Sequence, residues 1–389
     1  MQLMVCAVVT SGGHGRSSFM RLVFGLALVV VAACGPVSTG GPAGNPSSSS
    51  SASPTAGTRS PSAGLACRLP LADFEHPVGD YATGTLKTGF VTFPGASFAL
   101  DSNGAFEGPA ANGLVKSIAK PYLYGEPRVA TFTRRYGRWL PATVAAVSPD
   151  SSRYAYAEFY NDAGGPRSRI HVVDVVSAAD RIVYDQGFYA VIDYETDGIY
   201  LFAPAIADAP NRGLWRLDPQ ARSLREILPE NLSVDFVGSG AAWYGDLAPG
   251  DQPPISLKDN PMAQAFFKDR VIRRDLKSGA ATPWFRRPGQ EVRVIGVDGA
   301  GHPVVIMGPP TDAGTSTSQE LWLATGPNQA KQIYAGPGSA SADFVAFGSP
   351  LADIHGLWFG SNTGVHLYTP DGKFQKVSAA VGEVAGRCS

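Results

Sequence analysis

The segment from Thr143 to Asp185, TVAAVSPDSSRYAYAEFYNDAGGPRSRIHVVDVVSAADRIVYD, predicts a complete antiparallel sheet of four strands. Its four short runs are rich in β-branched and aromatic residues, and turn residues separate them. The proline, aspartate and serines at 149–152 favour a tight turn between the first two runs. A longer polar loop, Asn161–Ser168, is expected between the second and third runs. The expected strands are Val144–Ser148, Arg153–Tyr160, Arg169–Val175 and Arg181–Asp185.

The same four-run pattern recurs along the chain after this segment. The turns between first and second runs are 47, 42 and 59 residues apart, at Asp150, Asp197, Ser239 and Asp298. Four-stranded propeller blades repeat at this spacing, and packing such sheets around an axis covers both faces of each sheet. Residues 89–101 and 128–140 are expected to pair as one further blade. We therefore predict an all-β fold, a β-propeller of six four-stranded antiparallel blades, or of seven if residues 67–88 and the C-terminal tail add strands.

Two short motifs resemble those of known propellers. Residues 147–155, VSPDSSRYA, resemble the S-P-D-G motif of TolB-like and WD40-like repeats, with Ser151 in place of the usual glycine. Residues 357–365, LWFGSNTGV, resemble the W-F-G-T-x-x-G signature of streptogramin-lyase-like and sensor-kinase propellers. Streptogramin lyases use a histidine with a Glu-x-His pair, and this chain contains no Glu-x-His. The resemblance therefore implies the fold and leaves the activity open.

The N-terminal region predicts export and a lipid anchor. Residues 20–34, MRLVFGLALVVVAAC, resemble a bacterial lipoprotein signal peptide whose lipobox is Val31-Ala32-Ala33-Cys34. The resemblance implies that residues 1–33, or those from Met20 if translation begins there, are a signal peptide, and that Cys34 becomes the lipidated first residue. A plain secretory signal or a single membrane span are the alternatives, although the apolar run is shorter than the roughly 20 residues a span needs.

Residues 34–66 form the expected tether, and residues 67–389 form the expected propeller. From Gly35 to Ala66 almost every residue is Gly, Pro, Ser, Thr or Ala, so the segment cannot bury enough apolar area to fold. A flexible chain of this length reaches about 30 Å on average. The expected partners are the membrane, through the lipid, and a protein, small-molecule or glycan ligand.

Composition and cysteines agree with an exported β-protein. The 45 glycines and 31 prolines favour turns, and the formal charge of −1 lacks the basic footprint of nucleic-acid binding. Of the four cysteines, Cys6 precedes the expected cleavage site and Cys34 would carry lipid. The other two, Cys67 and Cys388, stand at the ends of the expected ring, and we predict a disulfide between them. Two free thiols are the alternative.

The sequence contains few candidates for chemistry. It has no Gly-x-Ser-x-Gly elbow, zinc-binding His-Glu-x-x-His or phosphate-binding glycine loop, and we predict no catalytic residue, metal site or cofactor. Asp193 and Glu195 are a carboxylate pair near the end of an inner strand, where such pairs perform glycosidase chemistry. His171 and His366 occupy third strands, where packing is the commoner role. Three arginines on an outer strand suit an anionic group or edge protection, namely Arg134, Arg135 and Arg138.

The loops between second and third strands are long and should emerge on one face, where binding usually resides. They span 103–127, 161–168, 204–212, 246–267 and 309–319. The candidate ligand-binding residues are Asp162, Asp208, Asn211, Asp246, Asp251, Lys258, Phe266 and Asp312. We therefore predict a surface-anchored lipoprotein that binds a ligand or envelope partner. A further class is a structural partner of envelope machinery, as in TolB-like proteins. An exported glycan-active or lyase-type enzyme, with catalytic groups at the axial mouth, is the alternative.

The longest interior loop, 246–267, has its own predicted structure. Its prolines should stiffen it, and Asn260-Pro261 predicts an N-capped helical turn over 262–267. Phe266 and Phe267 either contact a ligand or pin the loop to its own blade.

Overall fold

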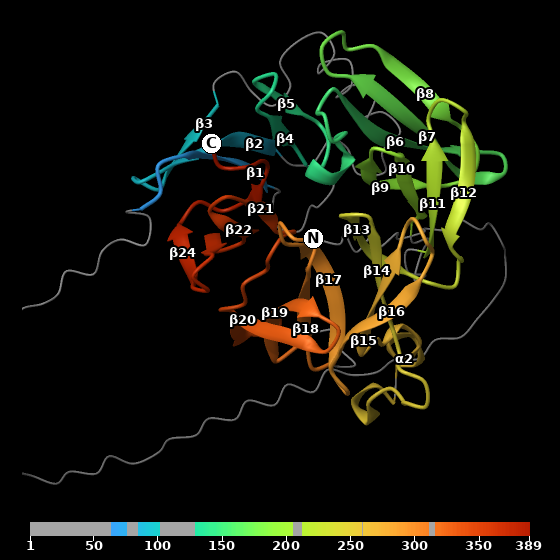
Figure 1. Cartoon of the computed structure of the whole chain (residues 1–389), viewed down its shortest axis with the longest axis vertical. Helices are drawn as coiled ribbons and strands as arrows, with labels where there is room; N and C mark the ends of the chain where they lie inside the picture. The colour runs from blue at the N-terminus through green and yellow to red at the C-terminus, as the bar shows by residue number, and fades with distance from the viewer. Residues whose placement is uncertain (1–63, 76–84, 102–128, 205–211, 259, 311–315) are drawn as a thin grey trace, which may run out of the picture. The chain divides into compact units, whose positions relative to one another are not determined.

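The computed structural model describes residues 64–75, 85–101, 129–204, 212–258, 260–310 and 316–389. Its antiparallel sheets form a six-bladed propeller (Figure 1). Blade 1 orders its strands as β25 (Glu383–Val384), β1 (Arg68–Glu75), β2 (Thr85–Thr92) and β3 (Ser97–Leu100). Blade 2 contains β6 (Arg153–Asp162), β7 (Gly165–Asp174) and β8 (Asp180–Tyr184), with a single bridge from Val147 to Tyr154 as its inner edge.

In each of the remaining four blades, strands that follow one another in the chain are hydrogen-bonded neighbours in the sheet. Blade 3 comprises β9 (Ala190–Glu195), β10 (Gly198–Ala203), β11 (Arg212–Asp218) and β12 (Ser223–Leu228). Blade 4 comprises β13 (Val234–Gly238), β14 (Ala241–Asp246), β15 (Arg270–Asp275) and β16 (Ala281–Arg286). Blade 5 comprises β17 (Glu291–Val297), β18 (Pro303–Gly308), β19 (Ser318–Gly326) and β20 (Gln329–Pro337). Blade 6 comprises β21 (Leu351–Asp353), β22 (Gly356–Ser361), β23 (Gly364–Tyr368) and β24 (Phe374–Ser378).

The first predicted blade is divided differently from the expectation. Residues 89–101 contribute to blade 1, whereas β4 (Thr131–Thr133) and β5 (Arg138–Leu140) form a separate two-stranded hairpin. The strands expected for a seventh blade, from 67–88 and the tail, complete blade 1 instead, and the tail also contacts the hairpin, where the N–H of Phe132 donates to the carbonyl of Ala385 at 2.7 Å. Aromatic packing holds the hairpin against blade 1, where the ring of Phe132 meets that of Phe90 at 4.9 Å.

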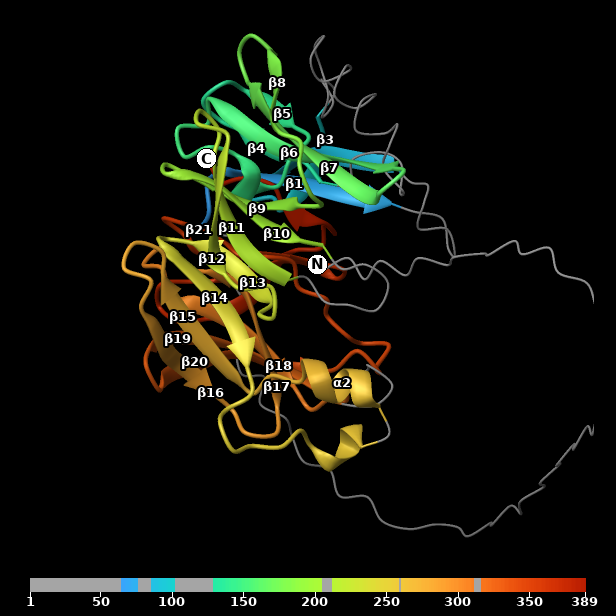
Figure 2. The ribbon, with the colours of Figure 1, turned by 90° about the vertical axis from the view of Figure 1, so that its right-hand side faces the viewer.

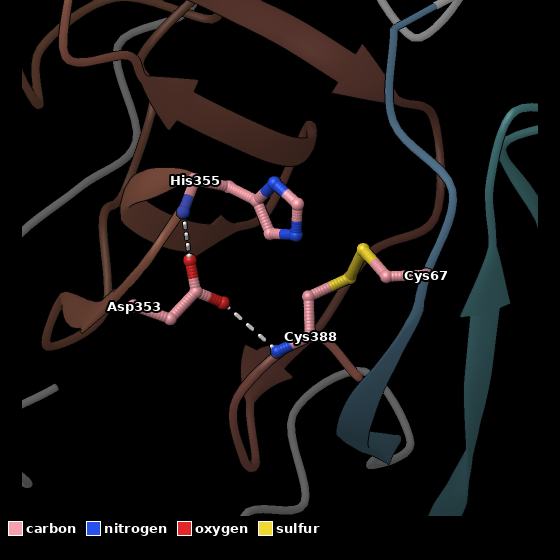
Figure 3. Close-up of a disulfide and its surroundings, with 4 residues drawn as sticks. All are labelled: Cys67, Asp353, His355 and Cys388. Atoms are coloured by element: carbon pink, nitrogen blue, oxygen red, sulfur yellow. Dashed lines mark hydrogen bonds between the residues drawn. A yellow bond between two sulfur atoms is a disulfide. The ribbon is translucent and has the colours of Figure 1, made fainter.

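Closure of the ring joins the two ends of the folded region. In the short ladder between β1 and β25, Leu71 pairs with Val384, and the backbone N–H of Arg68 donates to the carbonyl of Ser389 at 2.8 Å. Cys67 and Cys388 form the predicted disulfide, with Cα atoms 5.5 Å apart (Figure 3). The sequence prediction of this pairing is confirmed.

Apolar clusters fill the space between neighbouring blades. Trp243 of blade 4 packs with Val305 of blade 5, and Trp358 of blade 6 packs with Leu69 of blade 1. Both tryptophans are fully buried. Central strands such as β14 are buried on both faces because each blade is covered on both sides.

Two ends of the propeller differ in their connections. We call the end with the turns between first and second strands the turn face, and the end with the loops between second and third strands the loop face. The C-terminus lies at the turn face, whereas α2 (Pro261–Phe266) lies at the loop face (Figure 2). The disulfide belongs to the turn face too, because the N–H of Cys388 donates to Asp353 at the end of β21. The first described residue, Gly64, stands three positions before Cys67 and so joins the turn face.

Two local expectations in the opening segment were wrong. The residues expected as the strand 144–148 form the 3-10 helix η1 (Val144–Ala146), because the Thr143 hydroxyl accepts the N–H of Ala146 at 3.3 Å. The expected loop 161–168 is mostly strand, since β6 and β7 continue to a tight turn at 163–164. Cross-strand contacts favour this extension, because Arg167 pairs with Asp162 at 3.2 Å.

The turn at 149–152 has the conformation of a glycine-containing turn without the glycine. The Asp150 carboxylate accepts the Ser148 hydroxyl at 2.7 Å and the Ser152 N–H at 3.0 Å. These bonds, first that from the Ser152 backbone, lower the pKa of Asp150 to about 2. Ser151 has a φ of 58°, in the left-handed region that costs most side chains energy.

We expect Ser151→Gly to stabilise the propeller by about 1 kcal/mol, because glycine adopts the left-handed conformation without the Cβ clash. Ser151→Ala keeps that clash and should give no gain. Denaturant unfolding of both variants measures the difference. Equal effects of glycine and alanine would contradict the conformational reason.

Candidate functional site

The candidate site is the insertion between β14 and β15 on the loop face, residues 247–269. An ion pair joins its two ends, because Arg270 at the start of β15 contacts Asp246 at the end of β14. Arg270 donates from Nε to Oδ1 at 2.7 Å and from Nη2 to Oδ2 at 2.5 Å. This bidentate geometry restricts the angle at which the insertion leaves the sheet.

A second charged group holds the start of the insertion. Arg286 on β16 binds Asp251 and lies 3.6 Å from Asp269, whose carboxylate also accepts the N–H of Ala248 at 3.1 Å. The hydrogen bond from Arg286 holds the pKa of Asp251 below its usual range. Burial raises the pKa of Asp269. Asp246 and Asp251, both predicted ligand residues, therefore tie the insertion to its own blade.

The interior of the insertion is packed. Leu257, Phe267 and Ala248 are buried, and the Gln264 side chain donates to the carbonyl of Leu257 at 2.8 Å. The 3-10 helix η2 (Ile255–Leu257) precedes α2. Asn260 caps α2 by accepting the N–H of Ala263 at 2.9 Å, so the predicted capped helical turn is confirmed. The Phe267 side chain is buried and does not face solvent, whereas the Phe266 side chain lies outside the described part.

One large apolar side chain of the insertion faces solvent. Ile255 is 84% exposed, directly after Pro253 and Pro254, and the exposed Lys258 follows it by three residues. Sequence reasoning missed Ile255, although two prolines before a β-branched residue mark a stiff segment that presents it. The insertion thus holds an apolar anchor on a pre-ordered support.

The other predicted ligand residues are not gathered at this insertion by any described contact. Asp162 lies on blade 2, where Arg167 pairs with it. Asp208, Asn211 and Asp312 lie outside the described residues, as does the predicted lipidation site Cys34.

One carboxylate of the predicted pair on β9 is buried, and the other, Glu195, is half-buried. Asp193 on β9 is 7% exposed, and its Oδ2 has no hydrogen-bond partner. Burial, followed by the neighbouring Glu195 carboxylate, raises the pKa of Asp193 to about 9. Asp193 is therefore a neutral acid at pH 7.

The two strand histidines are packed residues. His171 lies between Asp180, 2.9 Å from its Nδ1, and Glu158, 3.3 Å from its Nε2, and it stacks on Tyr156. His366 stacks on Phe374, and burial followed by Lys376 lowers its pKa to about 4. Neither histidine lies open to a substrate.

Metal sites and membrane helices are absent from the part of the chain that the structure describes. Within the described ranges, no three His, Cys, Asp or Glu side chains are arranged to hold a metal ion. No helix within these ranges has the length and apolar character needed to cross a membrane.

No family model matches the chain, and no curated protein matches it in sequence. Among solved structures it is similar to TolB from Acinetobacter baumannii, with 10% identity and a TM-score of 0.40 over 82% of this chain and 67% of TolB. It is similar to an oligogalacturonate lyase in complex with manganese, with 12% identity and a TM-score of 0.39 over 81% of this chain and 86% of the lyase. It is also similar to the β-propeller domain of the Trilobed protease from Pyrococcus furiosus, with 12% identity and a TM-score of 0.40 over 80% of this chain and 86% of that domain. The fold assignment rests on the strand pairing above.

Asp193→Asn should stabilise the protein above neutral pH. Because the folded pKa lies above the unfolded value, the stability that Asp193 contributes is complete below about pH 4 and is lost as the pH rises through 9. A neutral amide of the same shape removes that loss, so the variant should gain about 2 kcal/mol or more at pH 9 relative to pH 7. The pKa of His366 is lowered to about 4 in the fold, and its titration is common to wild type and variant, so it cancels in the comparison.

The measurement is denaturant unfolding at pH 7, 8 and 9. Asp162→Asn, at an exposed ion pair, is the control and should follow wild type. If the free energy of unfolding of the wild type does not fall relative to that of Asp193→Asn as the pH rises from 7 to 9, Asp193 is not a buried neutral acid.

Proposed function

We propose that this chain is a surface-anchored lipoprotein whose propeller binds a protein of the cell envelope through its loop face. The observation that carries the proposal is Ile255, an exposed apolar side chain on an insertion that is already ordered. Ordering before binding reduces the entropy lost on association. Figure 2 shows the insertion projecting beyond the strands of blade 4. A projecting apolar residue suits a pocket on a protein, whereas a small molecule or glycan needs a concave site.

The disulfide supports an extracytoplasmic location, because such bonds persist in oxidising compartments. In addition to this location, the lipobox at Val31–Cys34 supports a lipid anchor. The tether would join the propeller at Gly64, on the turn face, so the loop face points away from the point of attachment. This arrangement leaves the insertion accessible to a partner.

An exported enzyme, glycan-active or lyase-type, is the second candidate. The specific observation in its favour is Asp193, a neutral acid beside Glu195, since a carboxyl group with a raised pKa serves as general acid in glycoside cleavage. Cleavage of envelope polysaccharide that is lost in both Asp193→Asn and Glu195→Gln, with the fold retained, would favour the enzyme over the binding module.

Ile255→Asp should weaken partner binding at least tenfold and leave the fold unchanged, because the side chain is exposed and a charge cannot enter an apolar pocket. The measurement is capture from an envelope extract of the native cells, followed by a dissociation constant for the captured protein. Val176→Asp is the matched control, since Val176 is 62% exposed in the turn after β7 and belongs to neither the insertion nor the turn-face pocket. Equal binding by the two variants would show that the loop face is not the interface.

Cys34→Ser should release the protein from membranes or block its processing, because the serine hydroxyl cannot carry the thioether-linked lipid. Fractionation and intact-mass measurement of the membrane-extracted protein test this. A variant that is processed and remains equally membrane-bound would rule out the anchor.

A further inference from the structure

A pocket of about 440 Å³ opens on the turn face, opposite the insertion. Its walls come from separate parts of the ring. Arg134 belongs to the β4–β5 turn, Gly299 to the β17–β18 turn, and Ala352, Asp353 and Ile354 to β21 and the turn after it, while Arg387 and Cys388 follow β25. The size is that of sites for small ligands or headgroups.

The side chains of the two pocket arginines have no partner among the described residues. Neither the Arg134 nor the Arg387 guanidinium makes a hydrogen bond or ion pair with any residue that the structure describes, although the backbone carbonyl of Arg134 accepts the N–H of Gly137 at 3.4 Å. Nearby arginines are engaged, since Arg135 donates to the carbonyl of Asp150 at 2.7 Å and Arg138 to that of Val175 at 2.9 Å. The absence of a side-chain partner therefore distinguishes Arg134 from the other two arginines of its hairpin.

The one acidic side chain in the wall is already bound. Asp353 accepts the N–H of His355 at 2.8 Å through Oδ1 and the N–H of Cys388 at 2.9 Å through Oδ2 (Figure 3). Its carboxylate is oriented toward the backbone of the closing segment. Two guanidinium groups against one bound carboxylate leave the pocket with a net positive charge, and a guanidinium binds phosphate or carboxylate through paired N–H groups.

The rim of the pocket is apolar. Ile354 is 87% exposed, the largest exposure among the described large apolar side chains. Cations beside an exposed aliphatic residue fit a ligand whose anionic group is joined to an apolar body. Gly64 and Cys67, where the tether joins the propeller, belong to the same face.

We propose that the turn-face pocket binds the phosphate group of an anionic phospholipid, with Ile354 entering the membrane interface beside it. This inference rests on the proposed membrane anchor, which supplies the membrane within reach of the pocket. Two arginines near an anionic surface bind it only weakly, so the contact depends on the high local lipid concentration that a tether provides. Docking by this face would direct Ile255 and the loop face outward.

The test uses the full chain carrying Cys6→Ser, held in vesicles by its own anchor. Ile354→Cys carries an environment-sensitive fluorophore, and Ile255→Cys on the opposite face carries the same label as the control. The vesicles contain phosphatidylcholine alone or mixed with phosphatidylglycerol. We expect a blue shift at position 354 only with phosphatidylglycerol, no shift at position 255, and weakening by salt.

Charge variants identify the pocket as the cause. Arg134→Gln or Arg387→Gln should remove most of the shift at position 354, whereas Arg225→Gln should keep it. Arg225 is an exposed arginine on the outer strand β12 and is the matched control. A shift that survives both pocket substitutions, or no shift with phosphatidylglycerol, would overturn the proposal.

Inorganic phosphate separates the two sources of a phosphate group. One outcome is that phosphate raises the melting temperature of the wild type but not of the Arg134→Gln and Arg387→Gln variants, while the fluorescence at position 354 does not change with phosphatidylglycerol vesicles. In that case the pocket binds a free anion and the lipid assignment is wrong. Flotation with phosphatidylcholine vesicles reports the anchor independently of the label. A chain that does not float contradicts the anchor, and excess phosphatidylglycerol vesicles then still test the pocket through position 354.

Discussion

The structure depends on closure of the ring by β25 and the Cys67–Cys388 disulfide. Each blade packs only against its neighbours, so an open ring would leave apolar surface bare on blade 1 and on blade 6. The ladder that closes it is short, with Leu71 opposite Val384 and Ala72 opposite Glu383. The disulfide joins residues 321 positions apart. In the chain-entropy model a cross-link that closes a loop of this length costs the denatured state about 6 kcal/mol of conformational freedom, which compensates for a short ladder.

The same closure explains a glycine in one of the sequence motifs. Gly360, in the Trp-Phe-Gly run of β22, faces the incoming C-terminal segment. A Cβ there would lie 2.1 Å from the carbonyl of Gly382, so only glycine lets β25 approach β22 this closely. Closure also assembles the turn-face pocket, because Asp353 of blade 6 binds the backbone of Cys388 only when the chain ends meet. The tether junction, the disulfide and the pocket thus share one position in the fold.

The sequence predicts this fold well where the evidence is local. The Ser-Pro-Asp turn, the capped helical turn after Asn260 and the repeat spacing each depend on residues close together in the chain. The predictions are wrong where residues far apart in the sequence determine which strands pair. Residues 97–100 and 131–133 belong to different sheets because β1 and β25, from opposite ends of the chain, complete blade 1. The length of β6 and β7 depends on cross-strand pairs such as Arg167 with Asp162. The polar composition of this segment predicts a loop when those pairs are not known.

The candidate sites follow the same division, and the decisive feature is which charges have partners. Acidic residues on a long loop predict ligand contacts, yet Asp246 and Asp251 are bound by arginines that lie on strands far along the chain. Such pairs add little free energy when they are partly exposed, and their main effect is to restrict the geometry of the insertion. On the turn face the situation is reversed. Among the residues described there, the single carboxylate of the pocket wall is bound to backbone groups, and the two guanidinium groups have no partner. Charged residues of both faces look alike in the sequence, and only their three-dimensional neighbours distinguish a charge that holds the scaffold from one that is available to a ligand.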